Sequence, residues 1–142
     1  MTPQETLVRS FVDLVLNEGQ LRLLTDFVSL DILEYSPFIL SAAHEAQDFA
    51  QDAQRLLAAF ADLRISIEQL IDSPGRVALS FSLSGCNTEP LPWAAQPTLR
   101  YASWPAMAML GIEGGRISAI RGISDRCALL TQLGLSDMAA KK

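Results

Sequence analysis

The chain has 142 residues, of which 49% are apolar and 19% are charged. This composition predicts one folded domain and argues against a disordered chain. A nucleic-acid partner is not expected, because 16 acidic against 11 basic residues give a net charge of −5 and a phosphate backbone requires a basic face. No apolar stretch approaches the roughly 20 residues that cross a membrane. No secretory signal is visible either, so we expect a cytoplasmic protein without a membrane partner.

The sequence offers few ligands for a metal ion. It contains one histidine, His44, and two cysteines, Cys86 and Cys127, at no spacing typical of a zinc site. We therefore expect no metal site. Two isolated cysteines without a secretory signal also indicate a reducing compartment.

The first half of the chain predicts helices. Residues 2–5 fit a capping box with proline at the first helical position, and apolar residues then recur at helical spacing up to Gly19. A shorter helix is expected over residues 20–28, and a short strand over residues 31–35. A third helix is predicted over residues 43–60, with an inner face formed by Phe49, Leu56, Leu57 and Phe60.

The second half alternates between apolar and polar residues, the period of a β-strand. We expect a bulge at Leu70–Ile71, where the alternation slips. We also expect a bend, a bulge or an edge position at Pro105, since proline has no N–H for a sheet. Residues 85–97 predict a loop, and residues 125–133 a closing helical turn. The expected strands run from Leu63 to the Ser73–Gly75 turn, from Val77 to Ser84, from Leu99 to Ile112 and from Arg116 to Ser124.

Helices followed by antiparallel strands predict an α+β fold. A bent antiparallel sheet with helices across one face forms a cone, and a cone of this size holds one buried small-molecule cavity. We expect residues 1–135 to form this single domain and residues 136–142 to be a flexible C-terminal tail.

Several short motifs follow one another in a characteristic order. They are Asn-Glu-Gly at 17–19, Phe-Ala-Asp-Leu at 60–63, Pro-Thr-Leu-Arg at 97–100, Gly-Gly-Arg-Ile at 114–117, Asp125, and Leu-Thr-Gln-Leu-Gly at 130–134. In this order they resemble the SnoaL-like polyketide cyclases, in the superfamily of the ketosteroid isomerases and nuclear transport factor two. The resemblance implies a cone-shaped, cystatin-like fold whose N-terminal helices pack on a curved antiparallel sheet and enclose a pocket.

The resemblance also implies a reaction. It predicts a cofactor-independent cyclase, isomerase or lyase of secondary metabolism that moves a proton on a small hydrophobic, polyketide-like carbonyl compound. In this family an aspartate just after the last strand is the general acid/base, and Asp125 takes that place. Three positions depart from the family pattern: Asn87 replaces a histidine, Glu89 replaces the glycine two residues after it, and Leu99 replaces the glycine of Pro-Thr-Gly-Arg.

Further residues could support such a reaction. Arg121 shares strand parity with Asp125 and could hold an anionic group or an enolate oxygen. Tyr35 could donate its hydroxyl to a carbonyl oxygen. Each has a structural alternative: Asp125 as a helix cap, Arg121 as a surface residue, and Tyr35 as part of the core wall. The candidates for substrate binding are Asn87, Trp104 and His44.

Two other functions stay open on the sequence. Epoxide hydrolysis, or an epoxide-opening cyclisation, relies in this superfamily on an Asp-Arg-Asp arrangement, to which Arg121 and Asp125 could contribute. The second carboxylate would then come from Asp31, Glu34 or Asp62. A non-catalytic ligand-binding or dimerisation module is the other alternative, favoured by the absence of the family's histidines.

The sheet predicts a partner of its own kind. Met107 and Met109 lie at the same strand parity and would occupy one surface of the sheet. An open sheet face that carries such side chains requires cover. We therefore expect a homodimer that forms through the open face of the sheet.

Overall fold

The computed structural model describes residues 1–29, 34–35, 49–91 and 96–135. The helical segments are α1 (Pro3–Ser10), η1 (Phe11–Asn17), η2 (Leu21–Leu23), α2 (Leu24–Phe27), α3 (Phe49–Ala59) and α4 (Arg126–Gln132). The strands are β1 (Glu34–Tyr35), β2 (Arg64–Ser73), β3 (Arg76–Cys86), β4 (Tyr101–Glu113) and β5 (Arg116–Ser124). None of the helices in these ranges is long and apolar enough to cross a membrane.

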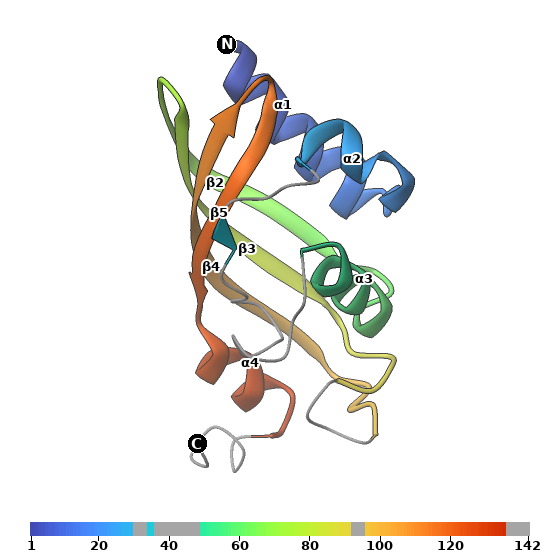
Figure 1. Cartoon of the computed structure of the whole chain (residues 1–142). Helices are drawn as coiled ribbons and strands as arrows, with labels where there is room; N and C mark the ends of the chain where they lie inside the picture. The colour runs from blue at the N-terminus through green and yellow to red at the C-terminus, as the bar shows by residue number, and fades with distance from the viewer. Residues whose placement is uncertain (30–33, 36–48, 92–95, 136–142) are drawn as a thin grey trace.

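The strands form one curved sheet in the order β1-β5-β4-β3-β2. Strands β2 to β5 are antiparallel neighbours, and the short β1 runs parallel to β5. The helical segments from α1 to α3 lie across one face of this sheet, and α4 lies beyond the end of β5 (Figure 1). The predicted α+β architecture, with N-terminal helices on a curved sheet, is confirmed.

Polar side chains fasten the first helix to the β2–β3 hairpin. Thr2 caps α1 by accepting a hydrogen bond from the Glu5 N–H (3.1 Å), as the capping box predicts. The Thr2 hydroxyl also donates to the carboxylate of Asp72, and Gln4 Nε2 donates to the same carboxylate (2.8 Å). Because both bonds stabilise the charged form, they hold the pKa of Asp72 below its ordinary value.

The first helix changes to a wider helical form about halfway along its predicted length. From Phe11 to Asn17 it is a π-helix, and the Glu18 N–H donates to the Asp13 carbonyl five residues earlier (2.9 Å). The side chain of Asn17 then pairs with the backbone of Ile65 in β2, donating to its carbonyl (2.9 Å) and accepting from its N–H (2.6 Å). These two bonds dock the end of the helix on the edge strand of the sheet.

The bulge in β2 is not where the sequence placed it. Leu70 and Ile71 pair regularly with β3, so the prediction of a bulge at these residues is wrong. The register shifts between Ile67 and Gln69, which leaves Glu68 as the extra residue. The shift lets Ile67 and Leu70 both pack against the core while Ile71 is exposed.

A second bulge lies in β5. Ala119 pairs with Gly111 and Ile117 pairs with Ile112, so Ser118 is the extra residue on this strand. The bulge breaks the strict alternation across β5, because Ile117 and Ile120 are both buried. Every residue after Ser118 therefore faces the side opposite to the one that simple parity with Ile117 predicts.

Pro105 lies within the central strand β4 without a bulge. It pairs with Ser82 of β3 in an unbroken register, so the expected bulge is not observed. Its carbonyl accepts from the Asp125 N–H (2.9 Å), so its backbone polar groups face the β5 side. The β4–β5 ladder ends one residue away, at Ala106 and Ser124. On the β5 side Pro105 therefore lies at a local edge of the sheet, one of the positions that the sequence offers for it, and its missing N–H interrupts no pair of the ladder.

Leu99 has a left-handed backbone, with φ of 59°, at the position where the family resemblance places a glycine. This conformation costs an L-residue about 1–2 kcal/mol, and the side chain is 69% exposed, so it packs little. Leu99→Gly should raise the free energy of unfolding by about 0.5–1 kcal/mol after the greater chain entropy of glycine is subtracted. Urea denaturation measures this gain. Leu99→Ala keeps the Cβ and should show no gain; an equal gain in both variants would contradict a backbone origin.

Candidate functional site

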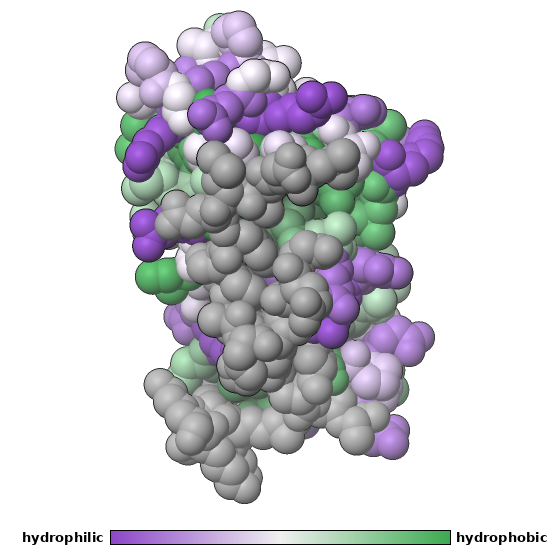
Figure 2. Space-filling model, in the orientation of Figure 1, coloured by the Kyte–Doolittle hydropathy of each residue, from purple (hydrophilic) through white to green (hydrophobic). Residues whose placement is uncertain are grey.

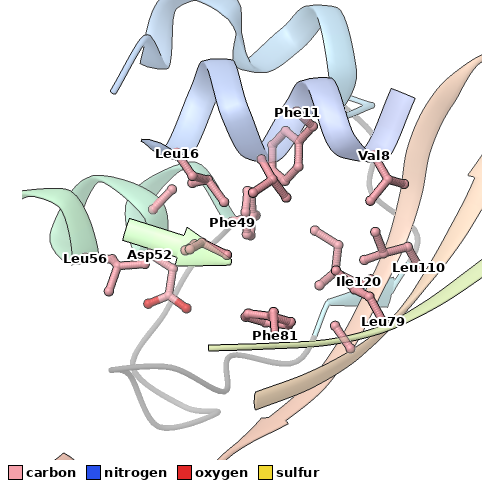
Figure 3. Close-up of a pocket in the computed structure, with 14 residues that line it drawn as sticks. Val8, Phe11, Leu16, Phe49, Asp52, Leu56, Leu79, Phe81, Leu110 and Ile120 are labelled. Carbon is pink, nitrogen blue, oxygen red and sulfur yellow. The ribbon is translucent and has the colours of Figure 1, made fainter. Parts of the chain in front are cut away.

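A pocket lies between the helices and the inner face of the sheet (Figure 3). The empty space within it and at its mouth, open solvent included, is about 650 Å³. The helical walls come from α1, η1 and α3, and the floor comes from strands β2 to β5. The described residues that line it are Val8, Phe11, Val12, Leu16, Phe49, Asp52, Ala53, Leu56, Ile65, Leu79, Phe81, Ala108, Leu110 and Ile120.

Aromatic rings form part of the helical wall. The Phe11 ring lies 5.8 Å from the Phe49 ring and 6.2 Å from the Phe27 ring, centroid to centroid, in tilted geometry. Apolar side chains also gather on the surface between α2 and α3 (Figure 2). Such walls suit a flat, apolar molecule better than a sugar or a nucleotide.

Asp52 is the one charged side chain among the pocket-lining residues within the described ranges. It is only 7% exposed, and its carboxylate points away from α3 into the space on the side of Phe81 (Figure 3). In such apolar surroundings a carboxylate can accept a proton or a hydrogen bond from a bound molecule with little competition from water. No cluster of three or more metal-ligating side chains occurs in the part of the chain that the structure describes.

Sequence reasoning missed Asp52, although its spacing carried a signal. It follows Phe49 by three residues and precedes Leu56 by four, so it lies on the apolar inner stripe of α3. Acidic residues are rarely buried without a reason. An aspartate inside the predicted inner face of a helix was therefore a marker for the pocket.

Asp125 is exposed and serves as the N-cap of α4. Its Oδ1 accepts a hydrogen bond from the Ala128 N–H (2.9 Å), which is the structural alternative that the sequence offered for it. It is not one of the described pocket-lining residues.

Arg121 and Tyr35 are both neighbours of the pocket residue Ile120: Arg121 follows it along β5, and Tyr35 lies across the β1–β5 ladder from it. Arg121 is exposed and pairs in register with Met109, on the face of the sheet away from the helices. The Ser118 bulge accounts for this placement. Tyr35 pairs through its backbone with Ile120 in the parallel β1–β5 ladder. His44 lies outside the described residues.

Asn87 is fully buried and holds the loop after β3 together. Its Nδ2 donates to the carbonyls of Ala59 (3.2 Å) and Glu89 (2.8 Å), and its Oδ1 accepts from the Thr98 N–H (2.7 Å). The structure therefore places this side chain in a network of backbone contacts, away from the described lining of the pocket.

Trp104 is 1% exposed and lies on the inner face of β4. Its ring packs against Phe60, with the centroids 5.3 Å apart. It is a core residue next to the pocket and not part of the described lining. It lies two positions along β4 from Ala106, and Ala106 pairs with the lining residue Phe81 of β3.

The family model of the SnoaL-like polyketide cyclases matches residues 6–133. Several solved structures have the same fold at low sequence identity. TsrD from Streptomyces laurentii is 19% identical, with a TM-score of 0.77 over 94% of this chain and 96% of its own. AclR from Streptomyces galilaeus, for which a hydroxylase function has been suggested, is 23% identical, with a TM-score of 0.77 over 92% of this chain and 84% of its own.

IdmH from Streptomyces antibioticus, for which a polyketide cyclase function has been suggested, gives a similar result. It is 20% identical, with a TM-score of 0.76 over 94% of this chain and 99% of its own. Comparison with curated protein sequences gave no match. At these identities the solved structures establish the cone-shaped fold, and the reaction has to be argued from the pocket.

Proposed function

The chain belongs to the SnoaL-like polyketide cyclase family, and we propose that it cyclises or isomerises a small hydrophobic, polyketide-like carbonyl compound without a cofactor. The observation that carries this proposal is the single carboxylate, Asp52, in the otherwise apolar described lining of the pocket. An apolar lining selects a hydrophobic molecule, and one carboxylate is enough to move one proton.

The proposed chemistry begins at a carbon next to the carbonyl group. The Asp52 carboxylate takes a proton from this carbon, the C–H bond breaks, and its electron pair moves onto the carbonyl oxygen to give an enolate. In a cyclisation the enolate carbon attacks a second carbonyl of the same molecule and forms the new C–C bond. The π bond of that second carbonyl breaks, and its oxygen, now an alkoxide, takes the proton back from the Asp52 carboxyl. In an isomerisation the Asp52 carboxyl returns the proton to another carbon. The apolar walls protect the enolate from protonation by water.

Asp52 and Asp125 are competing candidates for the base. The family resemblance implies Asp125, whereas the position in the pocket favours Asp52. We base the proposal on Asp52 because it is 7% exposed and lines the pocket, whereas Asp125 is exposed and is not among the described lining residues. Arg121 has no role in this proposal, because it is exposed on the face of the sheet away from the helices. Tyr35 stays a candidate for binding an oxygen of the substrate, since its backbone pairs with the pocket residue Ile120.

Hydrogen–deuterium exchange tests the proposal without knowledge of the natural substrate. Any reaction of this class removes a proton next to a carbonyl, so the protein in D₂O should catalyse loss of the α-proton NMR signal of 1-tetralone or larger polycyclic ketones. Ala108→Phe fills the floor of the pocket and should abolish the effect. Exchange at the buffer rate for every ketone, or undiminished exchange in the folded Ala108→Phe variant, would contradict the proposal.

The two alternatives have less support. Epoxide opening by an Asp-Arg-Asp arrangement requires an arginine in the pocket, and the lining residues within the described ranges include none. Asp62, one candidate for the second carboxylate, is exposed and accepts from the Cys86 N–H (2.7 Å). Ketone binding without exchange would instead favour a non-catalytic binding module.

We also propose that two copies pair through the outer face of the sheet. Large apolar side chains are exposed there, and Met107 (66% exposed) lies beside Ile123 (77% exposed) in the β4–β5 register. Tyr101 and Met109 extend the same face along β4. Monomers seldom leave such a surface uncovered.

Size-exclusion chromatography with light scattering at micromolar concentration should therefore give twice the chain mass of 15.5 kDa. Met107→Glu places a charge in this face and should shift the protein to the monomer. Gln54→Glu adds the same charge to an exposed position of α3 and should leave the dimer intact. A monomeric wild-type protein would refute the dimer.

A further inference from the structure

Trp104 carries a buried donor without an acceptor. Its side chain is 1% exposed, and Nε1 has no hydrogen-bond partner within the part of the chain described. Buried N–H groups of native proteins are nearly always paired, because an unpaired one forfeits its bond to water. The other buried side-chain atom without a partner in the described part of the chain is Thr88 Oγ1. The N–H of Thr88 donates to the carbonyl of Ala59, the residue that precedes Phe60.

The position of Trp104 relates this donor to the pocket. Along the inner face of β4, Trp104 and Ala106 precede Ala108, which lines the pocket. Across the β3–β4 ladder, Ala106 pairs with Phe81, another lining residue, so Phe81 and Trp104 are diagonal neighbours on one face. Ala106, the one residue between Trp104 and Ala108 on this face, has no side-chain atoms beyond Cβ.

The helical wall gives the same placement. The Trp104 ring packs on Phe60 at 5.3 Å, and Phe60 follows the lining residue Leu56 by one helical turn. Asp52 precedes Leu56 by one turn on the same face of α3. Asp52, Leu56 and Phe60 therefore follow one another at one-turn intervals along the helical wall, and the pair of Phe60 and Trp104 lies at the end of this row. The sheet residues Phe81 and Ala108 lie on the opposite side of the pocket.

We propose that the Trp104 indole N–H donates a hydrogen bond to a carbonyl oxygen of the bound molecule. This role rests on the proposed function, and it narrows the substrate of the protein to a compound whose carbonyl oxygen is buried when bound. When the base removes the α-proton, the electron pair of the C–H bond moves to this oxygen. The indole N–H stays protonated and bonds more strongly to the oxygen as it becomes negative. Trp104 thus supplies the donor, and the carboxylate accepts the proton.

Indole NMR of ¹⁵N-labelled protein tests this role. The chain has two tryptophans, Trp93 and Trp104, and Trp93→Phe assigns their two Nε1–H signals. The probes are 1-tetralone and tetralin, which share one skeleton and differ by a single carbonyl group. We expect 1-tetralone to move the Trp104 indole proton downfield and tetralin to leave it nearly unchanged.

A binding measurement provides the matched variant. Trp104→Phe keeps an aromatic ring and removes the N–H, so the affinity for 1-tetralone should fall roughly three- to tenfold. Any loss from altered packing affects both probes equally, so the affinity for tetralin reports it. An equal loss for the two probes would overturn the proposal.

The outcomes separate this inference from the proposed function. If 1-tetralone shifts the methyl signals of Leu110 and Ile120 in the pocket but not the Trp104 indole, the inference is wrong and the proposed function stands. If both probes shift the indole equally, the shift comes from the aromatic ring that they share and not from a hydrogen bond to the carbonyl, and the inference is again wrong. If neither probe shifts the indole or the methyl signals, the inference and the proposed function both fail.

Discussion

Asp52→Asn should lower the rate of ketone α-proton exchange at least a hundredfold while it changes ketone affinity only a few-fold. Asparagine has the shape of aspartate but cannot accept a proton, and a positioned general base contributes roughly 10²- to 10⁴-fold to such a step. The apolar walls that bind the ketone remain in place. Exchange is followed by NMR in D₂O, and binding of the same ketone is followed by thermal shift.

Two further variants determine how the result is interpreted. Asp13→Asn changes an exposed carboxylate on the outer side of η1 and should leave both exchange and binding unchanged. Asp125→Asn tests the base that the family resemblance implies. If exchange is lost in Asp125→Asn and retained in Asp52→Asn, the base is Asp125 and our assignment is wrong. If both variants bind and exchange like the wild type, neither carboxylate acts as the base.

The order of the elements could be predicted because the period of the apolar residues changes once, from helical to alternating near Leu63. The face of a residue within a strand could not be predicted as well. Around Ser118 the sequence reads Ile-Ser-Ala-Ile, which is compatible with either face of a strand. The register with β4 creates the bulge, and one extra residue reverses every side chain after it. For this reason the face of Arg121 could not be read from parity.

The candidate site was harder to predict than the fold because its parts come from distant segments. Asp52 lies on a predicted helical face, but the opposite wall is formed by residues such as Phe81 and Ile120, far along the chain. Only the folded sheet places these residues opposite the carboxylate. The family resemblance marked Leu99 as a departure, and the structure gives the departure a physical meaning, since the backbone there is left-handed.

The same limit applies to Asn87. The resemblance marked it as the replacement of a histidine, and a donor in the pocket was a reasonable expectation. Its three hydrogen bonds connect the end of α3, the loop after β3 and the residue Thr98. Segments up to 28 residues apart supply these partners, so local sequence contained no information about them.

Asn87→Asp should destabilise the protein by about 3 kcal/mol or more at pH 7. The side chain keeps its shape, but the donating Nδ2 becomes an oxygen that faces the carbonyls of Ala59 and Glu89. A buried carboxylate next to two carbonyl oxygens has no donor on that side, and leaving such groups unpaired costs more than a hydrogen bond is worth. Urea denaturation of both proteins measures the difference.

The pH dependence of that difference identifies its cause. Burial raises the pKa of the introduced carboxyl in the folded protein above its value in the unfolded chain. Between these two pKa values the folded state binds more protons, so the deficit relative to wild type should shrink as the pH falls from 7 to 4. Asn87→Ala loses the same bonds without gaining a charge, and its deficit should not change with pH. A deficit below 1 kcal/mol at pH 7 would mean that the Asn87 network does not form in solution. An unchanged deficit at pH 4 would assign the loss to the missing donors rather than to charge.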